Sequence, residues 1–248
     1  MPPPPVLIVA HPGHELLLHH WLERARPIVC ALTDGSGGHA LDRSGRSRRI
    51  IERAGARVGP VFAEATDREW YRAILAGDRR PFDLAAARIV DMCRAEGVTQ
   101  VVADSLEYFN PMHDLCSSLA HAVSIRLQGS GTLELLTYPI ERPELLSEVP
   151  RHTYALDDAA FERKLDAAAE YHELTAEVEG RRLEARKNLG VERLFAVDVD
   201  RGWSVVPPEK PFYEKFGRQM IARGTYADLI TYADHVRPLA LMLTGAGS

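Results

Sequence analysis

The sequence predicts an α/β fold, namely a doubly wound and mostly parallel sheet with an α-rich C-terminal extension packed on it. Between residues 6 and 138, short apolar runs alternate with amphipathic helical patterns, which is typical of βαβ units with right-handed crossovers. The first run, 6–9, is apolar throughout, as in a strand buried on both faces. After Pro150 the pattern becomes mainly helical, so we expect one domain with a core of residues 1–145 and an extension of residues 146–248.

The individual elements follow from the same patterns. Apolar runs bounded by turn residues predict strands at 6–9, 27–32, 59–63, 100–103, 133–138 and 193–199. Apolar residues at helical spacing predict a helix that begins at Pro12 and further helices at 44–56, 70–76, 82–95, 112–128, 158–187, 213–223 and 226–243. Pro12 suits the first turn of its helix, where the missing N–H costs nothing. The alternating charges of 177–187 indicate a solvated helix face.

The composition excludes several classes of protein. Of the 248 residues, 46% are hydrophobic and 26% are charged, which is ordinary for a globular protein in water. The net charge of −5 gives no basic field, so we expect a small-molecule substrate and no nucleic acid. No apolar run is long enough to span a bilayer, and the prolines after Met1 do not resemble a secretory signal. The three cysteines have no paired spacing, so we expect Cys30 and Cys93 in the core and the protein in the cytoplasm. A homo-oligomer is compatible with all of this.

Histidines mark the loops after two of the predicted strands. His11 and His14 follow the first strand, and His113 follows the fourth. In a doubly wound sheet these strands are commonly neighbours, so their loops flank the switch point of the topology, where ligands bind. Three imidazoles with an open position suit a catalytic Zn²⁺ ion or another borderline ion such as Fe²⁺. Each histidine alone also has a structural explanation: a turn residue for His11, a hydrogen-bonded core residue for His14 and part of a helix N-cap for His113.

Three short motifs together resemble those of the PIG-L/LmbE-like deacetylases. They are Ala10-His11-Pro12-x-x-Glu15 after the first strand, Leu32-Thr33-x-Gly35 after the second and Asn110-Pro111-x-His113 after the fourth. The resemblance covers the predicted core, with a family-like helix near Lys164. It implies a Rossmann-like fold with a zinc ion at the switch point, and an enzyme that removes acyl groups from N-acetylglucosamine-type sugars.

The chain also departs from the motifs of this family. The family's first motif is His-Pro-Asp-Asp-Glu, so His14 stands where an aspartate ligand is expected and Gly13 stands where the family has its general base. The second motif is His-Pro-Asp-His, so Asn110 replaces the assisting histidine and Met112 replaces the aspartate. The resemblance therefore implies a metal set in altered form, made of His11, His14 and His113, and a replaced acid/base set.

Other polar residues in the loops at the same sheet edge are candidates for the missing catalytic groups. Asp114 and Asp34 are candidate bases, as are Asp104 and Glu107, and Asp114 is alternatively placed to orient His113. Asn110 is expected to donate a hydrogen bond to a developing oxyanion. Glu15 is expected to be structural. Candidate substrate contacts are Arg48, Glu107 and Tyr213, the last within a segment, 210–218, that suits a lid or a subunit contact.

The leading functional hypothesis is a metal-dependent hydrolase that removes an acyl group from an N-acyl sugar or a small N-acylated metabolite. Two alternatives remain open. A three-histidine centre also suits iron, hence a divergent metalloenzyme with different chemistry. The loss of the acid/base groups also suits a catalytically silent homologue that only binds its ligand.

Overall fold

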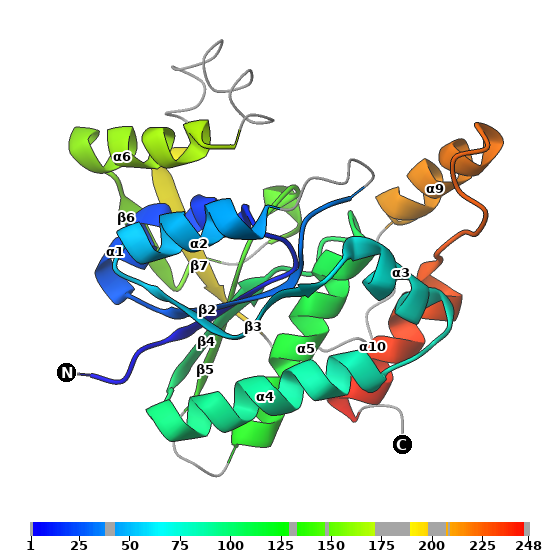
Figure 1. Cartoon of the computed structure of the whole chain (residues 1–248), viewed down its shortest axis with the longest axis horizontal. Coiled ribbons are helices and arrows are strands. Elements are labelled where there is room, and N and C mark those ends of the chain that lie inside the picture. The colour runs from blue at the N-terminus through cyan, green and yellow to red at the C-terminus, as the bar shows by residue number, and fades with distance from the viewer. Residues whose placement is uncertain are drawn as a thin grey trace.

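The computed structural model describes residues 2–37, 43–128, 133–146, 149–171, 189–197, 207 and 209–245. These residues form a seven-stranded sheet with the order β3-β2-β1-β4-β5-β7-β6 (Figure 1). Five strands are parallel: β1 (Val6–Val9), β2 (Ile28–Thr33), β3 (Arg57–Ala65), β4 (Gln100–Asp104) and β5 (Glu134–Tyr138). Two further strands pair antiparallel, β6 (His152–Ala155) and β7 (Val191–Ala196). The predicted doubly wound, mostly parallel α/β sheet is confirmed.

Helices cover both faces of the sheet (Figure 1). One face carries α1 (His19–Ala25), α2 (Ser44–Arg53) and α6 (Asp158–Ala169), and the other carries α3 (Asp67–Leu75), α4 (Arg80–Glu96), α5 (Pro111–Leu127) and α10 (Arg237–Thr244). Every residue of β1 and β2 is buried, since these strands lie between the two helical layers. Cys30 and Cys93 lie in the core as predicted. In the described part of the chain, no helix is both long enough and apolar enough to cross a membrane.

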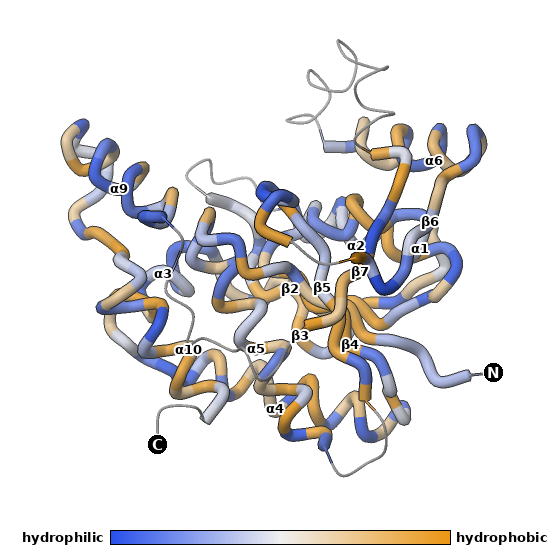
Figure 2. Tube along the Cα trace, turned by 180° about the vertical axis from the view of Figure 1, so that it is seen from behind, coloured by the Kyte–Doolittle hydropathy of each residue, from blue (hydrophilic) through white to orange (hydrophobic). Residues whose placement is uncertain are grey.

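The C-terminal extension completes the sheet and covers one of its faces. Its strand β7 pairs with β5, and α10 packs on α5 through Leu239, Ala240 and Leu243 in the main core cluster. Figure 2 shows apolar residues along the strands and the inner faces of these helices, with α9 (Phe212–Ala222) projecting from the body. The expectation that the extension packs on the sheet is therefore correct.

Several element boundaries differ from the predictions. The first helix starts at His14 as a 3₁₀ turn, η1 (His14–Leu18), so Pro12 precedes it and does not form its first turn. Strand β6 was not predicted, because its sequence HTYA is half polar and half exposed. The predicted helix 226–243 begins only with the π-helical turn η4 (Tyr232–Val236), where the Thr231 hydroxyl accepts from the Asp234 N–H. Helix α6 ends at Ala169; residues 172–188, which include most of the rest of the predicted helix 158–187 and its charged face 177–187, lie outside the described residues.

Candidate metal centre

The loops after β1 and β4 bring three histidines together. These strands pair in parallel, with Ile8 opposite Ala103, so their carboxyl ends meet at one sheet edge. The ring centroids of His11 and His14 lie 5.3 Å apart, those of His11 and His113 5.3 Å, and those of His14 and His113 4.6 Å. The structure thus places the three predicted ligand side chains in one cluster.

Glu15 braces the loop that carries His11 and His14. Its buried carboxylate accepts hydrogen bonds from the Gly13 N–H at 2.7 Å, the Ser47 hydroxyl at 2.8 Å and the Tyr171 hydroxyl at 2.9 Å. Gly13 itself has φ of 112°, a conformation that side chains with a Cβ rarely adopt. The structural role expected for Glu15 agrees with these contacts.

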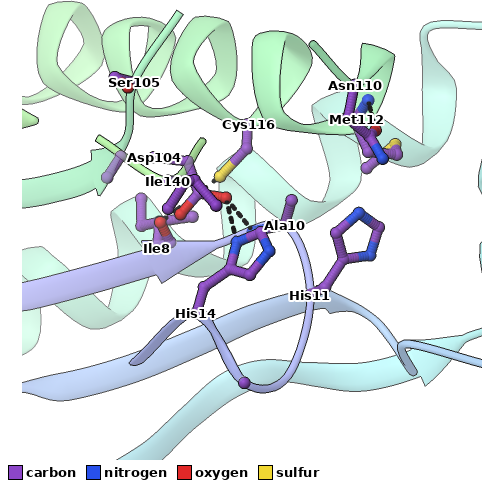
Figure 3. A network of polar contacts seen from close by, with 12 residues as sticks. Ile8, Ala10, His11, His14, Asp104, Ser105, Asn110, Met112, Cys116 and Ile140 are labelled. Carbon is purple, nitrogen blue, oxygen red and sulfur yellow. Dashed lines mark hydrogen bonds and ion pairs between the residues drawn. The ribbon is translucent and has the colours of Figure 1, made fainter. Parts of the chain in front are cut away.

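Asp104 at the end of β4 binds the ring of His14 (Figure 3). Its Oδ2 lies 2.8 Å from His14 Nδ1 and also accepts from the Ala10 N–H at 2.9 Å, while Oδ1 accepts from the Tyr138 hydroxyl at 2.9 Å. Burial alone would lower the pKa of His14, but the charge and hydrogen bond of Asp104, together with the charges of Glu15 and Glu141, outweigh burial and raise that pKa. An acidic residue already noted as a candidate base is therefore a hydrogen-bond partner of a candidate ligand.

Asp67 has a comparable position beside His11. His11 Nδ1 lies 2.8 Å from Thr33 Oγ1 and 3.0 Å from Asp67 Oδ1. Burial would raise the pKa of Asp67, but the His11 imidazole and the Gly37 N–H outweigh it and lower that pKa to about 2. Sequence reasoning missed Asp67. The available signal was its place after the third strand, at the same sheet edge as the histidines.

His113 differs from the other two histidines because no described residue orients its ring. Its Nδ1 is buried without a hydrogen-bond partner, and Asp114 does not bond to it there. Burial, followed by the neighbouring His14 and His11, lowers the pKa of His113 well below its usual range, so this ring is neutral. A buried imidazole nitrogen without a partner is expensive unless it binds something.

These observations test whether the residues fit a divalent ion. The Nδ1 of His14 is bonded to Asp104, and the Nδ1 of His11 is bonded to the Thr33 hydroxyl with Asp67 beside it. This leaves the Nε2 of both rings for an ion, while His113 has an unpartnered buried nitrogen. The donor types therefore fit Zn²⁺ or Fe²⁺. Among the described residues, however, no group of three or more His, Cys, Asp or Glu side chains is arranged closely enough to hold a metal ion as it stands.

The predicted catalytic residues lie in three different environments. Asn110 is the N-cap of α5: its Oδ1 accepts from the Met112 N–H at 2.8 Å and from the Tyr71 hydroxyl at 3.2 Å. Asp114 is fully buried, where its Oδ1 accepts from the N–H groups of Glu107 and Tyr108. Burial raises the pKa of Asp114 to about 8, despite those two bonds.

The third of these residues, Asp34, is half-buried in the loop after β2. Its Oδ1 accepts from the N–H of Ser36 at 3.0 Å and from the N–H of Asp67 at 3.2 Å. The same carboxylate therefore shapes its own loop and fixes the residue that contacts His11.

The predicted substrate contacts are less closely linked to the histidines. Arg48 is exposed, with its guanidinium 5.1 Å from the centre of the Phe62 ring. Glu107 is fully buried and its carboxylate accepts from the Ser105 hydroxyl and from the N–H groups of Ile140 and Glu141. Tyr213 is buried in α9, where its hydroxyl has no hydrogen-bond partner among the described residues. These contacts do not include any of the three histidines.

Known proteins match this chain in structure but not in sequence. No protein-family model matches the chain, and no curated protein sequence matches it. The structure is similar to that of Dbv21, a deacetylase of the antimicrobial A40926 pseudoaglycone, with a TM-score of 0.53 and 15% identity over 78% of this chain and 97% of that one. It is also similar to the conserved protein TT1542 from Thermus thermophilus, with a TM-score of 0.50 and 17% identity over 77% of this chain and 91% of that one.

A third similar structure is a triple mutant of a deacetylase involved in the teicoplanin biosynthetic pathway. Its TM-score is 0.52 and its identity 10%, over 78% of this chain and 99% of that one. At these identities the likeness establishes a shared α/β fold.

Proposed function

We propose that this chain is a metal-dependent hydrolase similar to the PIG-L/LmbE deacetylases, which removes an acyl group from an N-acyl sugar or a small N-acylated metabolite. The observation that carries the proposal is the convergence of His11, His14 and His113, with ring centroids 4.6 to 5.3 Å apart, from the loops of two neighbouring parallel strands. The fold shared with two deacetylase structures supports it.

The three histidines would hold a divalent ion, with Zn²⁺ the first choice and Fe²⁺ the second. Such an ion supplies Lewis-acid polarisation of the acyl oxygen and makes water more acidic. Because all three side chains are neutral ligands, the nearest negative charges are those of Asp67 and Asp104, each behind one imidazole. The negative charge of this site would therefore lie on residues that contact the ligands, Asp67 and Asp104, and not on a ligand itself.

Asn110 and two carboxyl groups would stabilise the oxyanion and transfer the protons. Both hydrogen bonds of Asn110 with described residues use Oδ1, so within that part of the chain its NH₂ group is left to donate to the developing oxyanion of the acyl group. Asp34 is half-buried, whereas Asp114 is fully buried, so Asp34 is the better of these two carboxyl groups to accept the proton of the attacking water. Asp114 holds its own proton at neutral pH, because burial raises its pKa to about 8, and it suits proton donation to the leaving amine.

Substrate binding is proposed for Arg48, Tyr213 and the loop of Glu107. Arg48 is one of several exposed arginines of α2, and Tyr213 carries a buried hydroxyl without a partner among the described residues. Glu107 contributes through the shape of its loop, since its carboxylate is bonded to Ser105 and to the backbone of 140–141. A cytoplasmic location and a homo-oligomeric state complete the proposal.

The experiment combines metal binding with amine release. Purified full-length protein is titrated with ZnCl₂ by calorimetry, and the loaded protein is incubated with N-acetylglucosamine and related N-acyl sugars while free amine is measured. We expect one zinc per chain, amine release by the loaded protein, and loss of both in His113→Ala. His121→Ala, a half-buried histidine on the same helix, is the matched control and should change neither.

The outcomes separate the hypotheses. Amine release with zinc supports the hydrolase. Binding of Fe²⁺ but not zinc, measured anaerobically in parallel, would replace it with the iron enzyme. Zinc binding without release of amine from any N-acyl sugar would favour the silent ligand-binding homologue. Failure to bind either ion would overturn the metal centre itself.

A further inference from the structure

We propose that Asp104 is a positioning residue that fixes the tautomer and orientation of His14, so that Nε2 of this imidazole is the atom offered to the metal. This inference rests on the proposed function, because the atom it positions is one ligand of the proposed ion. It concerns one of the positions at which the chain departs from the motifs of the PIG-L/LmbE-like deacetylases, where His14 stands in place of an aspartate ligand.

The hydrogen bonds around Asp104 determine where the proton on His14 lies. Asp104 Oδ2 accepts from the Ala10 N–H, a group that can only donate, so this oxygen presents lone pairs. His14 Nδ1 lies 2.8 Å from the same oxygen. Two acceptors would repel each other at this distance, so Nδ1 carries the hydrogen and Nε2 carries the lone pair.

Burial and anchoring make this arrangement rigid. The side chain of Asp104 is 0% exposed, and its other oxygen accepts from the Tyr138 hydroxyl at 2.9 Å. Its backbone belongs to β4, the strand that pairs with β1 directly beside the loop of His14. A carboxylate that also accepts from the Ala10 N–H and the Tyr138 hydroxyl, which lie on two separate segments, cannot turn away from the His14 ring without breaking buried hydrogen bonds.

His113 lacks a partner like Asp104, and comparison with it shows what Asp104 does for His14. His113 has no partner on its buried Nδ1 among the described residues, so no hydrogen bond there selects one of its tautomers. Carboxylates behind metal-binding histidines typically contribute about 10- to 100-fold in metal affinity. Asp104 therefore supplies His14 with both an orientation and a negative charge, which replace those of the directly bound aspartate expected at position 14.

The first measurement reads the tautomer without any metal. Nitrogen NMR of the metal-free protein labelled with ¹⁵N-histidine, at a pH where His14 is neutral, should show His14 with hydrogen on Nδ1. Asp104→Ala should give a mixture of tautomers. Asp104→Asn should keep the Nδ1–H form, because the amide oxygen still accepts from Ala10 and His14. An unchanged tautomer in Asp104→Ala would overturn the inference.

The second measurement is zinc affinity by calorimetry with ZnCl₂. We expect Asp104→Asn, which keeps the shape of the side chain but not its charge, to bind zinc about 10-fold more weakly, and Asp104→Ala about 100-fold more weakly. Tyr138→Phe, which removes the bond to the other oxygen, should have a smaller effect than either. If Asp104→Ala does not fold, Asp104→Asn decides: affinity equal to the wild type would overturn the inference.

The two proposals fail in different ways. If the wild type binds zinc and both Asp104 variants bind it equally well, the positioning role is wrong and the metal centre stands. If the wild type binds neither zinc nor iron while its His14 tautomer depends on Asp104, the metal centre is wrong. Asp104 then only orients a structural histidine.

Discussion

Lys164 and Glu192 form a buried ion pair, with Lys164 Nζ 2.8 Å from Glu192 Oε1 and side chains that are 3% and 0% exposed. Lys164 also donates to the Leu17 carbonyl at 2.7 Å, and Glu192 accepts from the N–H groups of His20 and Trp21. The pair therefore ties α6 and β7 to the helical turn that follows the loop of His11 and His14. Burial lowers the pKa of Lys164, although the charge of Glu192 opposes this shift.

Removing the cation of this pair should destabilise the fold. We expect Lys164→Met to reduce the free energy of unfolding by about 3–5 kcal/mol, because it leaves the Glu192 charge buried without its partner. Urea denaturation measures this. The control is Arg163→Ala, on the same helix as Lys164. It breaks the ion pair of the exposed Arg163 with Glu23 and should cost at most about 1 kcal/mol. Equal losses in both variants would contradict the importance of the buried pair.

Position 13 is glycine for a backbone reason, so placing aspartate there, as in the motif of the PIG-L/LmbE-like deacetylases, should strain the loop. A Cβ at Gly13 would lie 3.7 Å from the Tyr171 ring, an ordinary contact, whereas φ of 112° strains any residue with a side chain. We expect Gly13→Asp and Gly13→Ala each to lower the free energy of unfolding, measured in urea, by about 1–3 kcal/mol. A Gly13→Asp variant as stable as the wild type would show that the loop adapts without cost.

The sequence alone predicts that the three histidines converge, but not which side chains contact them. The apolar run of β1 predicts a strand buried on both faces, and its pairing with β4 follows from the doubly wound order. These two steps bring His113 to His11 and His14. Each depends on a local pattern combined with a general rule of topology, which is why both could be made from the chain alone.

The side-chain partners of the histidines depend on three-dimensional details that no local pattern encodes. Asp67 meets His11 only because β3 ends level with β2, after register shifts in that pairing. Glu107 is polar and lies in a loop, which predicts exposure, but three hydrogen bonds hold it inside the protein. Strand β6 has no apolar run, and only its pairing with β7 makes it a strand.

Asn110 combines a structural and a proposed catalytic role that substitution can separate. Its Oδ1 caps α5, and serine is an equally good N-cap residue without an NH₂ group. We expect Asn110→Ser to keep the stability of the wild type and to lower kcat for amine release about 100-fold. Asn110→Ala should lose both the activity and about 1 kcal/mol of stability. Full activity in Asn110→Ser would remove this residue from the proposed chemistry.

His19 should make the stability of the protein depend on pH. It is buried, with 4% of its surface exposed, and its Nδ1 has no hydrogen-bond partner among the described residues. Burial lowers the pKa of His19 to about 4; the charge of Glu23 opposes this shift and that of Lys164 adds to it. Between pH 4 and the ordinary histidine pKa of about 6.5, the unfolded chain therefore binds a proton that the folded chain does not.

Because the unfolded chain binds this proton and the folded chain does not, His19 makes the protein less stable as the pH falls. The contribution of His19 is fully present above about pH 6.5 and is lost as the pH falls toward 4, by up to about 3 kcal/mol. His19→Gln removes the titrating group, so its free energy of unfolding should fall less between neutral pH and the pKa of about 4 than that of the wild type. Urea denaturation at a series of pH values measures the difference, with the adjacent His20→Gln as control. If His19→Gln follows the wild-type pH profile, the pKa of His19 is the same in the folded and the unfolded protein, and burial does not lower it.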